Sequence, residues 1–521
     1  MDVTSMPLQH QIGQRMMVGF DGPELSEDVI RLIREYKIGN IILFSWNITS
    51  KGQMMDLCRQ IQELVLKETG LPAFIAIDQE GGAVSRLPSD ATRIPGAMAL
   101  AATGDPDCAL EAGRITGREL RTLGANFNLA PVLDVNSNDD NPVIGVRSYG
   151  SEPETVVRFA LAMMRGLKEG GVLSCGKHFP GHGDTSVDSH LALPTVDKSL
   201  EELRRTELVP FQAAIDAGIP AIMSSHILFP QLDPDVPATM SRRILTDLLK
   251  REMGFSGLVL TDCLEMKAIR HSFGTVRGAL SALKAGADLV LISHTASLAE
   301  EAAQAIYDAW NAGEFDAAEW NESLEKIAKL KWTYGTLPAA DPEVIGCNAH
   351  RDTNMALLKR TISPVNVPGG RLPELGARPH FVGCPAFRAT LVSSVKADEV
   401  TFPEYMAARL QGRATVSAPN PTEEDIAAVV RETSGATSIV VGTYNGHLHP
   451  GQIALVNALA KTGVPVIAVA LRNPYDLKML DRSVYSLAAY EYTDQLFDAL
   501  VEVLQGKAVP GGKVPVDVMP S

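Results

Sequence analysis

A single fourteen-residue stretch concentrates side chains that can do chemistry. It reads Lys177-His178-Phe179-Pro180-Gly181-His182-Gly183-Asp184-Thr185-Ser186-Val187-Asp188-Ser189-His190 and follows a short apolar run, Gly171 to Cys175. This mixture is untypical of a hydrophobic core, because each charge buried there would need a partner. Asp188 and His190 are two positions apart, so the carboxylate can orient an imidazole that carries protons. The stretch is therefore predicted to be a loop that folds over a pocket at the end of a strand.

Two other interpretations of this loop stay open on residue types alone. The loop can be purely structural, or His178, His182 and His190 can bind a metal together with an aspartate. A metal-dependent hydrolase is therefore a second hypothesis beside proton transfer by His190.

A second candidate is the carboxylate of Asp262, which ends the apolar run Gly257-Leu258-Val259-Leu260-Thr261. A carboxylate in such a position can attack the anomeric carbon of a sugar and form a covalent glycosyl-enzyme. The structural alternative is a helix N-cap, because a helical pattern begins soon after Asp262. Position alone favours neither interpretation.

Two further segments bring charged side chains to predicted strand ends. Asp78 and Arg86 belong to the first segment, IDQEGGAVSRL, and Arg147 belongs to the second, NPVIGVRSYG. Asp78 can accept hydrogen bonds from sugar hydroxyls, and Arg86 can support Asp78 by ion pairing. The alternative for both segments is a structural ion pair or a solvated turn.

Apolar strand-like runs alternate with helical patterns from the start of the chain to about residue 335. The predicted strands are Met16–Phe20, Ile38–Phe44, Phe74–Asp78, Phe127–Pro131, Leu173–His178, Ala221–His226, Leu258–Asp262 and Asp288–Ile292. The predicted helices between them include Leu25–Tyr36, Met54–Thr69, Pro106–Leu123, Glu154–Glu169 and Leu200–Ala217. Eight strands, each followed by a helix, predict a (β/α)8 TIM-type barrel, and near-continuous apolar strands are typical of a parallel sheet buried on both faces.

Polar side chains stand where four of these predicted strands end, namely Asp78, His178, His226 and Asp262. The carboxyl ends of the strands of such a barrel face one mouth, so residues far apart in sequence can converge there. The active site is therefore predicted at that mouth.

A second α/β pattern follows a segment typical of a linker. A last helix, Glu319–Tyr334, is predicted to close a first domain over residues 1–335, and residues 336–350 form the linker. Further strands are predicted at Pro379–Gly383, Ser438–Gly442, Pro465–Ala470 and Val484–Ala489. Residues 351–521 are therefore predicted to form an αβα sandwich, and 521 residues suffice for two such cores.

Composition argues against several classes of partner. The net charge of −15, without any basic run, is untypical of proteins that bind nucleic acid or anionic membranes. No apolar run approaches membrane-spanning length, and the N-terminal residues lack the pattern of a signal peptide. The six cysteines form no CxxC pair, which is typical of reduced thiols. We expect a cytoplasmic protein that acts on a small molecule, and its oligomeric state is left open.

Four blocks of the sequence resemble glycoside hydrolase family 3, and within it the bacterial exo-β-N-acetylglucosaminidases. The blocks are IDQEGGAVSRL, NPVIGVRSYG, KHFPGHGDTSVDSH and LVLTDCLEM, and they span most of residues 10–335. The resemblance implies that Asp262 is the nucleophile, that His190 is the acid/base and that Asp188 is the partner of His190. It also implies that the terminal sugar is held by Asp78, Arg86, Arg147, Lys177 and His178.

The resemblance further implies a retaining reaction that needs no metal and no cofactor. Such a reaction removes β-linked N-acetylglucosamine from the non-reducing end of cell-wall muropeptides or chitin-derived fragments. Many relatives have an SDD-type stretch where this chain has Thr261-Asp262-Cys263, but the aspartate is kept. Relatives with wider glucosidase specificity usually take a glutamate acid/base from the second domain, which the DSH sequence makes unnecessary here.

Three alternatives to a glycoside hydrolase remain. A phosphorylase is the first, because a histidine acid/base repels incoming phosphate less than a carboxylate does. The others are a metal-dependent amidohydrolase and a non-catalytic sugar sensor. The joint presence of Asp188, His190 and Asp262 argues against the sensor, since binding alone needs no such pair.

Overall fold

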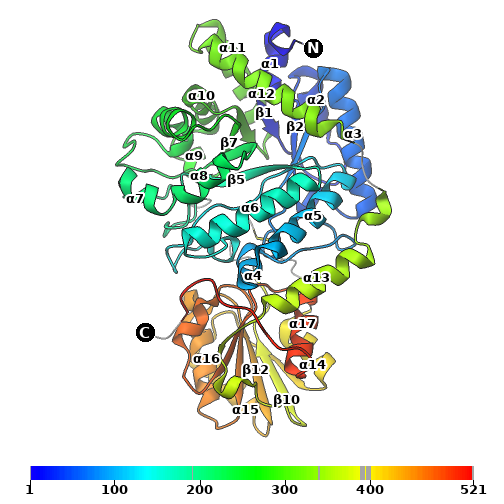
Figure 1. The fold of residues 1–521 in the computed structure, drawn as a ribbon, viewed down its shortest axis with the longest axis vertical. Coiled ribbons are helices and arrows are strands. Elements are labelled where there is room, and N and C mark those ends of the chain that lie inside the picture. The colour runs from blue at the N-terminus through cyan, green and yellow to red at the C-terminus, as the bar shows by residue number, and fades with distance from the viewer. Residues whose placement is uncertain (1, 190–191, 338–340, 388–392, 395–399, 519–521) are drawn as a thin grey trace.

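The chain folds into a closed eight-stranded parallel barrel and a second unit built on a six-stranded sheet (Figure 1). This computed structural model describes residues 2–189, 192–337, 341–387, 393–394 and 400–518. The predicted fold class, a (β/α)8 barrel followed by an α/β unit, is confirmed.

The barrel strands lie where the sequence predicts them. They are β1 (Met16–Val18), β2 (Asn40–Leu43), β3 (Phe74–Ile77), β4 (Phe127–Asn128), β5 (Leu173–Phe179), β6 (Ala221–Ser224), β7 (Leu258–Cys263) and β8 (Leu289–Ile292). Each strand pairs in parallel with the next, and β8 closes the barrel on β1 through pairs such as Leu291 with Met17. Strand β4 is shorter than predicted, and Pro131 beyond it has no N–H with which to continue the ladder.

Most helices of this part of the chain surround the barrel on its outer side, whereas α4 (Ala97–Ala102) lies towards the second unit and α9 (Lys267–Arg270) lies at the barrel mouth. The others are α1 (Leu8–Gln14), α2 (Glu27–Glu35), α3 (Lys51–Thr69), α5 (Pro106–Leu123), α6 (Pro153–Glu169), α7 (Leu200–Arg205), α8 (Leu208–Asp216), α10 (Thr275–Ala285), α11 (Ala296–Asn311) and α12 (Ala317–Gly335), with a π-helix at Arg243–Glu252. The predicted helix Leu200–Ala217 is divided into α7 and α8, because Pro210 cannot donate a hydrogen bond to the carbonyl of Thr206. Within the described ranges, no helix combines the length and the apolar character that crossing a membrane requires.

Alternate residues of each barrel strand face two different apolar cores. Side chains such as Met17, Ile42, Ala76 and Leu260 fill the inside of the barrel. Their neighbours along the strands, such as Ile41 and Val259, pack outward against the helices. Both faces are buried, which explains why each strand reads as a continuous apolar run.

The second unit has six strands in the order β11-β10-β12-β13-β14-β9. Their bounds are β9 (Ser363–Asn366), β10 (Pro379–Gly383), β11 (Arg413–Val416), β12 (Ser438–Thr443), β13 (Val466–Ala470) and β14 (Tyr485–Ala488), and only β9 runs antiparallel among these strands. Val440 and Ile467 pack on the side of α13 (Asn348–Thr361), α14 (Phe402–Leu410) and α17 (Asp494–Leu504). Ile439 and Val441 pack on the side of α15 (Glu423–Glu432) and α16 (Pro450–Ala460). The unit is therefore a three-layer αβα sandwich.

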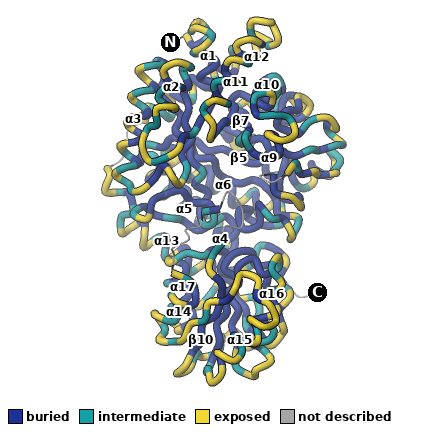
Figure 2. Tube along the Cα trace, turned by 180° about the vertical axis from the view of Figure 1, so that it is seen from behind, coloured by how far each residue is buried: buried dark blue, intermediate teal, exposed yellow. Residues whose placement is uncertain are grey.

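The barrel and the second unit are packed against each other along α4 and α13. Met98 and Ala99 of α4 belong to a core cluster of the second unit, and buried backbone continues across the junction in Figure 2. His350 of α13 contacts Glu119 of the barrel, with 2.7 Å between Nδ1 and Oε1. Helix α13 begins at Asn348, inside the predicted linker, and the domain limits at residues 335 and 351 stay a prediction.

Candidate active site

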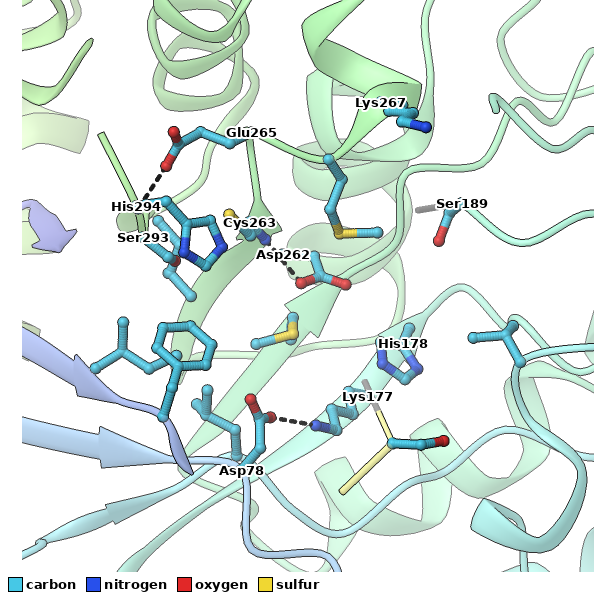
Figure 3. Close-up of a pocket in the computed structure, with 18 of the residues that line it drawn as sticks. Asp78, Lys177, His178, Ser189, Asp262, Cys263, Glu265, Lys267, Ser293 and His294 are labelled. Carbon is cyan, nitrogen blue, oxygen red and sulfur yellow. Dashed lines mark hydrogen bonds and ion pairs between the residues drawn. The ribbon is translucent and has the colours of Figure 1, made fainter. Parts of the chain in front are cut away.

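A cavity of about 520 Å³ opens at the barrel mouth where the strands end (Figure 3). Six of the predicted site residues line it: Asp78, Arg86, Arg147, Lys177, His178 and Asp262. Asp188 is buried and does not line the cavity, whereas the next residue, Ser189, does. His190 lies outside the described residues. The described part of the predicted site is thus gathered at one end of the barrel.

An array of ion pairs forms one side of the cavity. The ammonium group of Lys177 lies 2.7 Å from an oxygen of Asp78 and 2.8 Å from an oxygen of Glu80. Arg147 donates two hydrogen bonds to Glu80, of 2.9 and 2.8 Å. The four side chains are only 2–14% exposed. The ion pair predicted between Arg86 and Asp78 is wrong, because the cationic partner of Asp78 in the described structure is Lys177.

Electrostatics keep this array ionised. Burial raises the pKa of the Glu80 carboxyl, but Arg147 and Lys177 outweigh burial and hold that pKa well below its usual range. Burial likewise lowers the pKa of Lys177, but Asp78 and Glu80 outweigh it and raise that pKa. Fixed carboxylates accept hydrogen bonds and fixed cations donate them, so the array is suited to the hydroxyl groups of a sugar.

His178 is oriented by a carboxylate that the sequence analysis missed. Nδ1 of His178 lies 2.7 Å from Oδ2 of Asp134, and the backbone N–H of His178 donates to Oδ1 at 3.1 Å. Burial raises the pKa of Asp134, but His178 outweighs burial and lowers it. Nε2 of His178 lies 3.4 Å from Arg147 at the cavity. The mostly apolar run that contains β4 continues past Pro131 to Asp134, so the strand-end rule applied three residues later would have found this carboxylate.

His182 braces the loop from inside. Its Nδ1 lies 2.9 Å from the hydroxyl of Thr185, and its Nε2 lies 3.0 Å from the hydroxyl of Ser189. Burial and the neighbouring His178 lower the pKa of His182 to about 4, so this imidazole is neutral at neutral pH. Both ring nitrogens are therefore engaged within the loop. Among the described residues, no group of three or more His, Cys, Asp or Glu side chains is arranged to hold a metal ion.

Asp262 lies in β7 and faces the cavity. Its Oδ1 accepts a hydrogen bond of 2.7 Å from the N–H of Cys263. The helix-cap interpretation of Asp262 is wrong, because the N-cap of α9 is Met266. Figure 3 shows the Asp262 carboxylate between Lys177 on one side and Lys267 on the other.

Two contacts fix the segment that carries Asp262. His226, predicted at the same mouth, does not line the cavity; its Nε2 lies 2.9 Å from the carbonyl of Cys263. The N–H of Ala268 donates to the carbonyl of Ser189 at 3.4 Å. The loop after β5 and the segment after β7 therefore touch each other at the mouth.

The second unit contributes two serines to the cavity wall, Ser393 and Ser394. The hydroxyl of Ser394 accepts hydrogen bonds from Arg86 at 2.6 Å and from the N–H of Ser85 at 3.2 Å. Arg472 donates to the hydroxyl of Ser393 at 3.0 Å. Sequence reasoning missed both serines, because Ser394 and Arg86 are 308 positions apart and neither serine belongs to a recognisable motif.

Comparisons with known proteins agree with this geometry. A family model described as the glycosyl hydrolase family 3 N terminal domain matches residues 7–330. Beta-hexosaminidase A of Pseudoalteromonas piscicida is 39% identical over 332 residues, which are 59% of this chain and 55% of that protein. The beta-hexosaminidase of Thiobacillus denitrificans is 36% identical over 292 residues, which are 55% of this chain and 80% of that protein. The chain thus spans only about half the length of the first of these relatives.

A solved structure extends the likeness to the second unit. It is described as a glycoside hydrolase family 3 beta-N-acetylglucosaminidase from Paenibacillus sp. and is 37% identical, with a TM-score of 0.92. The superposition covers 99% of this chain and 100% of that one. The family that the sequence blocks resemble is therefore confirmed: this chain belongs to glycosyl hydrolase family 3.

Proposed function

We propose that this chain is a retaining exo-β-N-acetylglucosaminidase that removes N-acetylglucosamine from the non-reducing end of its substrate. The relatives named above are called beta-hexosaminidases or beta-N-acetylglucosaminidases, which supports the choice of sugar. The observation that carries the proposal is that Asp262 lines the same cavity as the charged array of Asp78, Lys177 and Arg147.

The array favours cleavage at the end of a glycan rather than within it. Glu80, Lys177 and Arg147 are buried and joined by short ion pairs, so the cavity is closed on that side. A terminal sugar can place its hydroxyl groups on Asp78, Lys177 and Arg147, but a chain cannot continue past them. The remainder of the substrate must leave through the opposite side of the mouth.

The proposed reaction is a two-step displacement. In the first step the Asp262 carboxylate attacks the anomeric carbon while His190 donates a proton to the leaving oxygen, and the glycosidic bond breaks. In the second step His190 takes a proton from water, the water oxygen attacks the anomeric carbon, and the bond to Asp262 breaks. Two inversions give net retention, and Asp188 is assigned to orient His190.

The test is a product assay on aryl β-glycosides that differ only at the 2-position of the sugar. The 2-acetamido compound should be cleaved with a kcat/KM at least about a hundredfold above that of the 2-hydroxyl compound, a ratio typical of sites that hydrogen-bond the distinguishing group. Equal rates, or a preference for the 2-hydroxyl compound, would contradict the proposed specificity.

Two additions to the same assay separate the alternatives. Hydrolysis gives free N-acetylglucosamine at a rate independent of added phosphate, whereas phosphorolysis gives the sugar 1-phosphate. Exhaustive chelation leaves the proposed reaction intact and stops a metal-dependent hydrolase. A cytoplasmic location also stays a prediction, and cell fractionation tests it.

A further inference from the structure

A second cavity, of about 660 Å³, lies at the end of the barrel opposite the mouth. Its lining includes Arg15, Ser256 and Gly286, which come just before β1, β7 and β8, and the first part of α12. The N-terminal ends of barrel strands face away from the mouth, so this cavity is separate from the candidate active site. Figure 1 shows α10 and α12, which border the cavity, in the half of the barrel remote from the second unit.

Three cations converge there on one buried carboxylate. Asp288 is fully buried, and the ammonium groups of Lys250 and Lys326 lie 3.5 and 3.4 Å from its Oδ1. Arg15 is also buried, and its guanidinium donates to the backbone carbonyls of Asp288 at 3.2 Å and Ala287 at 2.7 Å. Both ammonium groups approach the same oxygen atom, so a single negative charge serves a close group of cations.

The other charged side chains of this cavity are largely balanced. Three further cations have carboxylate partners, in the pairs Arg242–Glu319, Lys284–Glu314 and Arg251–Asp247. Asp316 accepts two backbone N–H groups as the N-cap of α12. Glu322 lies 3.5 Å from Lys326, but its side chain is 68% exposed, so this pair offsets little charge. The cluster of Arg15, Lys250 and Lys326 thus keeps an excess of positive charge.

The pKa values of this cluster agree with a missing counter-charge. Burial lowers the pKa of Lys250 more than Asp288 raises it. Burial likewise lowers the pKa of Arg15 to about 10, although Asp288 raises it. By contrast, the carboxylates beside Lys177 at the mouth outweigh burial and raise the pKa of Lys177. An additional anion in the second cavity would favour the charged forms of its cations.

The cluster also has hydrogen-bond donors to spare. An ammonium group carries three N–H donors. Within the described ranges, Lys250 has one contact with a carboxylate oxygen, Lys326 has two such contacts of 3.4 Å or more, and Nη1 of Arg15 forms no hydrogen bond. A phosphate group has a charge of about −2 and three strong acceptor oxygens, which match these donors.

We propose that this cavity binds the phosphate group of a small molecule through Lys250, Lys326 and Arg15. The phosphate shares the two ammonium groups with Asp288 and supplies the negative charge that the cluster lacks. The site goes beyond the proposed function, because it lies at the other end of the barrel and includes none of the residues assigned to the reaction. The alternative is a purely structural cluster that fixes Asp288 at the start of β8.

The test is a thermal melt of the chain with inorganic phosphate, in which phosphate replaces chloride at constant ionic strength. The melting temperature of the parent protein should rise with phosphate concentration and give an apparent Kd, because a ligand that binds only the folded chain stabilises it. Constant ionic strength keeps the general screening of charges equal. A titration with glucose 6-phosphate distinguishes the two sources of the group: a lower apparent Kd indicates a phosphorylated molecule, and an equal one indicates free phosphate.

Lys250→Gln/Lys326→Gln should raise the apparent Kd for phosphate at least about tenfold, since it removes two charge-assisted hydrogen bonds. The matched control is Lys267→Gln/Arg270→Gln, which removes the same charge from exposed residues on the open side of the mouth and should keep the apparent Kd of the parent protein. If Lys250→Gln/Lys326→Gln does not fold, Lys326→Gln alone carries the test, with an expected rise of about fivefold. Lys250→Gln/Lys326→Gln should leave kcat for an aryl β-N-acetylglucosaminide unchanged.

Three results overturn the inference. The first is a melting temperature that phosphate raises no more than chloride does. The second is an unchanged apparent Kd in Lys250→Gln/Lys326→Gln, or in Lys326→Gln where that variant carries the test, because phosphate would then bind elsewhere. The third is an equal rise in Kd in both double variants, because net charge alone would then explain the effect. A rise in Kd that is confined to the variants of the second cavity supports the inference.

Discussion

The charged side chains on the two sides of the barrel mouth differ in burial and in ion pairing. On the closed side, Glu80, Lys177 and Arg147 are buried and Asp78 is partly buried, and each charge has a partner within 3 Å. On the open side, Lys267 and Arg270 are exposed and have no partner among the described residues. Buried ion pairs hold a fixed geometry, whereas exposed cations contribute little until a ligand arrives. The closed side therefore presents a fixed set of donors and acceptors to the cavity, whereas the open side presents cations that remain in contact with solvent.

Asp262 stands between the two sides, and its replacement should have the largest effect. Asp262→Asn keeps the shape of the side chain but removes the nucleophile, so kcat for an aryl β-N-acetylglucosaminide should fall at least about a thousandfold. Glu265→Gln is the control, since Glu265 lines the same cavity but binds two backbone N–H groups. A loss in Glu265→Gln equal to that in Asp262→Asn would contradict the assignment.

Glu80→Gln should remove the ion pairs that Glu80 forms on the closed side. Arg147 and Lys177 would lose the carboxylate that they share, and an uncompensated buried charge lowers the free energy of unfolding by about 3 kcal/mol. Chemical denaturation measures this loss, and kcat/KM should fall with it. The control is Glu300→Gln at the surface, where Glu300 pairs with Arg31 and the expected loss is below about 1 kcal/mol. Equal losses would remove the distinction between buried and exposed pairs.

Glu491 contrasts with Glu80, because it is buried without a cation partner in the described structure. Burial raises the pKa of the Glu491 carboxyl to about 7, above the value of about 4.3 expected in the unfolded chain. The stability it contributes is therefore fully present below the unfolded pKa and is lost as pH rises through about 7. The parent protein should lose about 2 to 3 kcal/mol of unfolding free energy between about pH 5 and about pH 8 through this group. Denaturation at both pH values tests this: Glu491→Gln should flatten the dependence, and an unchanged slope would contradict the shift.

Of these substitutions, Ser394→Ala should have the smallest effect on the kinetic constants. Arg86 would lose the hydroxyl that holds it from the second unit, and a single hydrogen bond of this kind is worth about 1 kcal/mol, or about fivefold in KM. Because Ser394 acts through Arg86, KM should rise while kcat changes less. Ser89→Ala is the control, since Ser89 is exposed and lies outside the cavity. A fall in kcat with unchanged KM would argue against a positioning role.

The sequence predicts the fold well where strands are buried on both faces. All eight barrel strands were predictable, because Met16 and Met17, for example, face different cores but are both apolar. The two strands missed in the second unit lie at the edges of its sheet. Most of β11 is exposed, and β9 contains Pro364, so neither has the apolar pattern of a central strand.

From the residues alone, the candidate site was predictable where a polar residue directly ends a predicted strand. Asp78, His178 and Asp262 satisfy this rule and line the cavity, whereas His226 satisfies it and does not. Asp134 lies beyond Pro131, outside the strand as predicted, and was missed. Ser394 was missed because its place depends on how the second unit packs on the barrel. The roles of Asp188 and His190 stay predictions, as His190 is outside the described residues.

The most direct test of the account is to trap the covalent intermediate. A 5-fluoro derivative of N-acetylglucosaminyl fluoride, whose second step is slow, is incubated with the protein, and the labelled peptide is identified by mass spectrometry. One equivalent of sugar is expected on Asp262. A label on Glu265 or on another carboxylate, or steady turnover of substrate without any label, would contradict it.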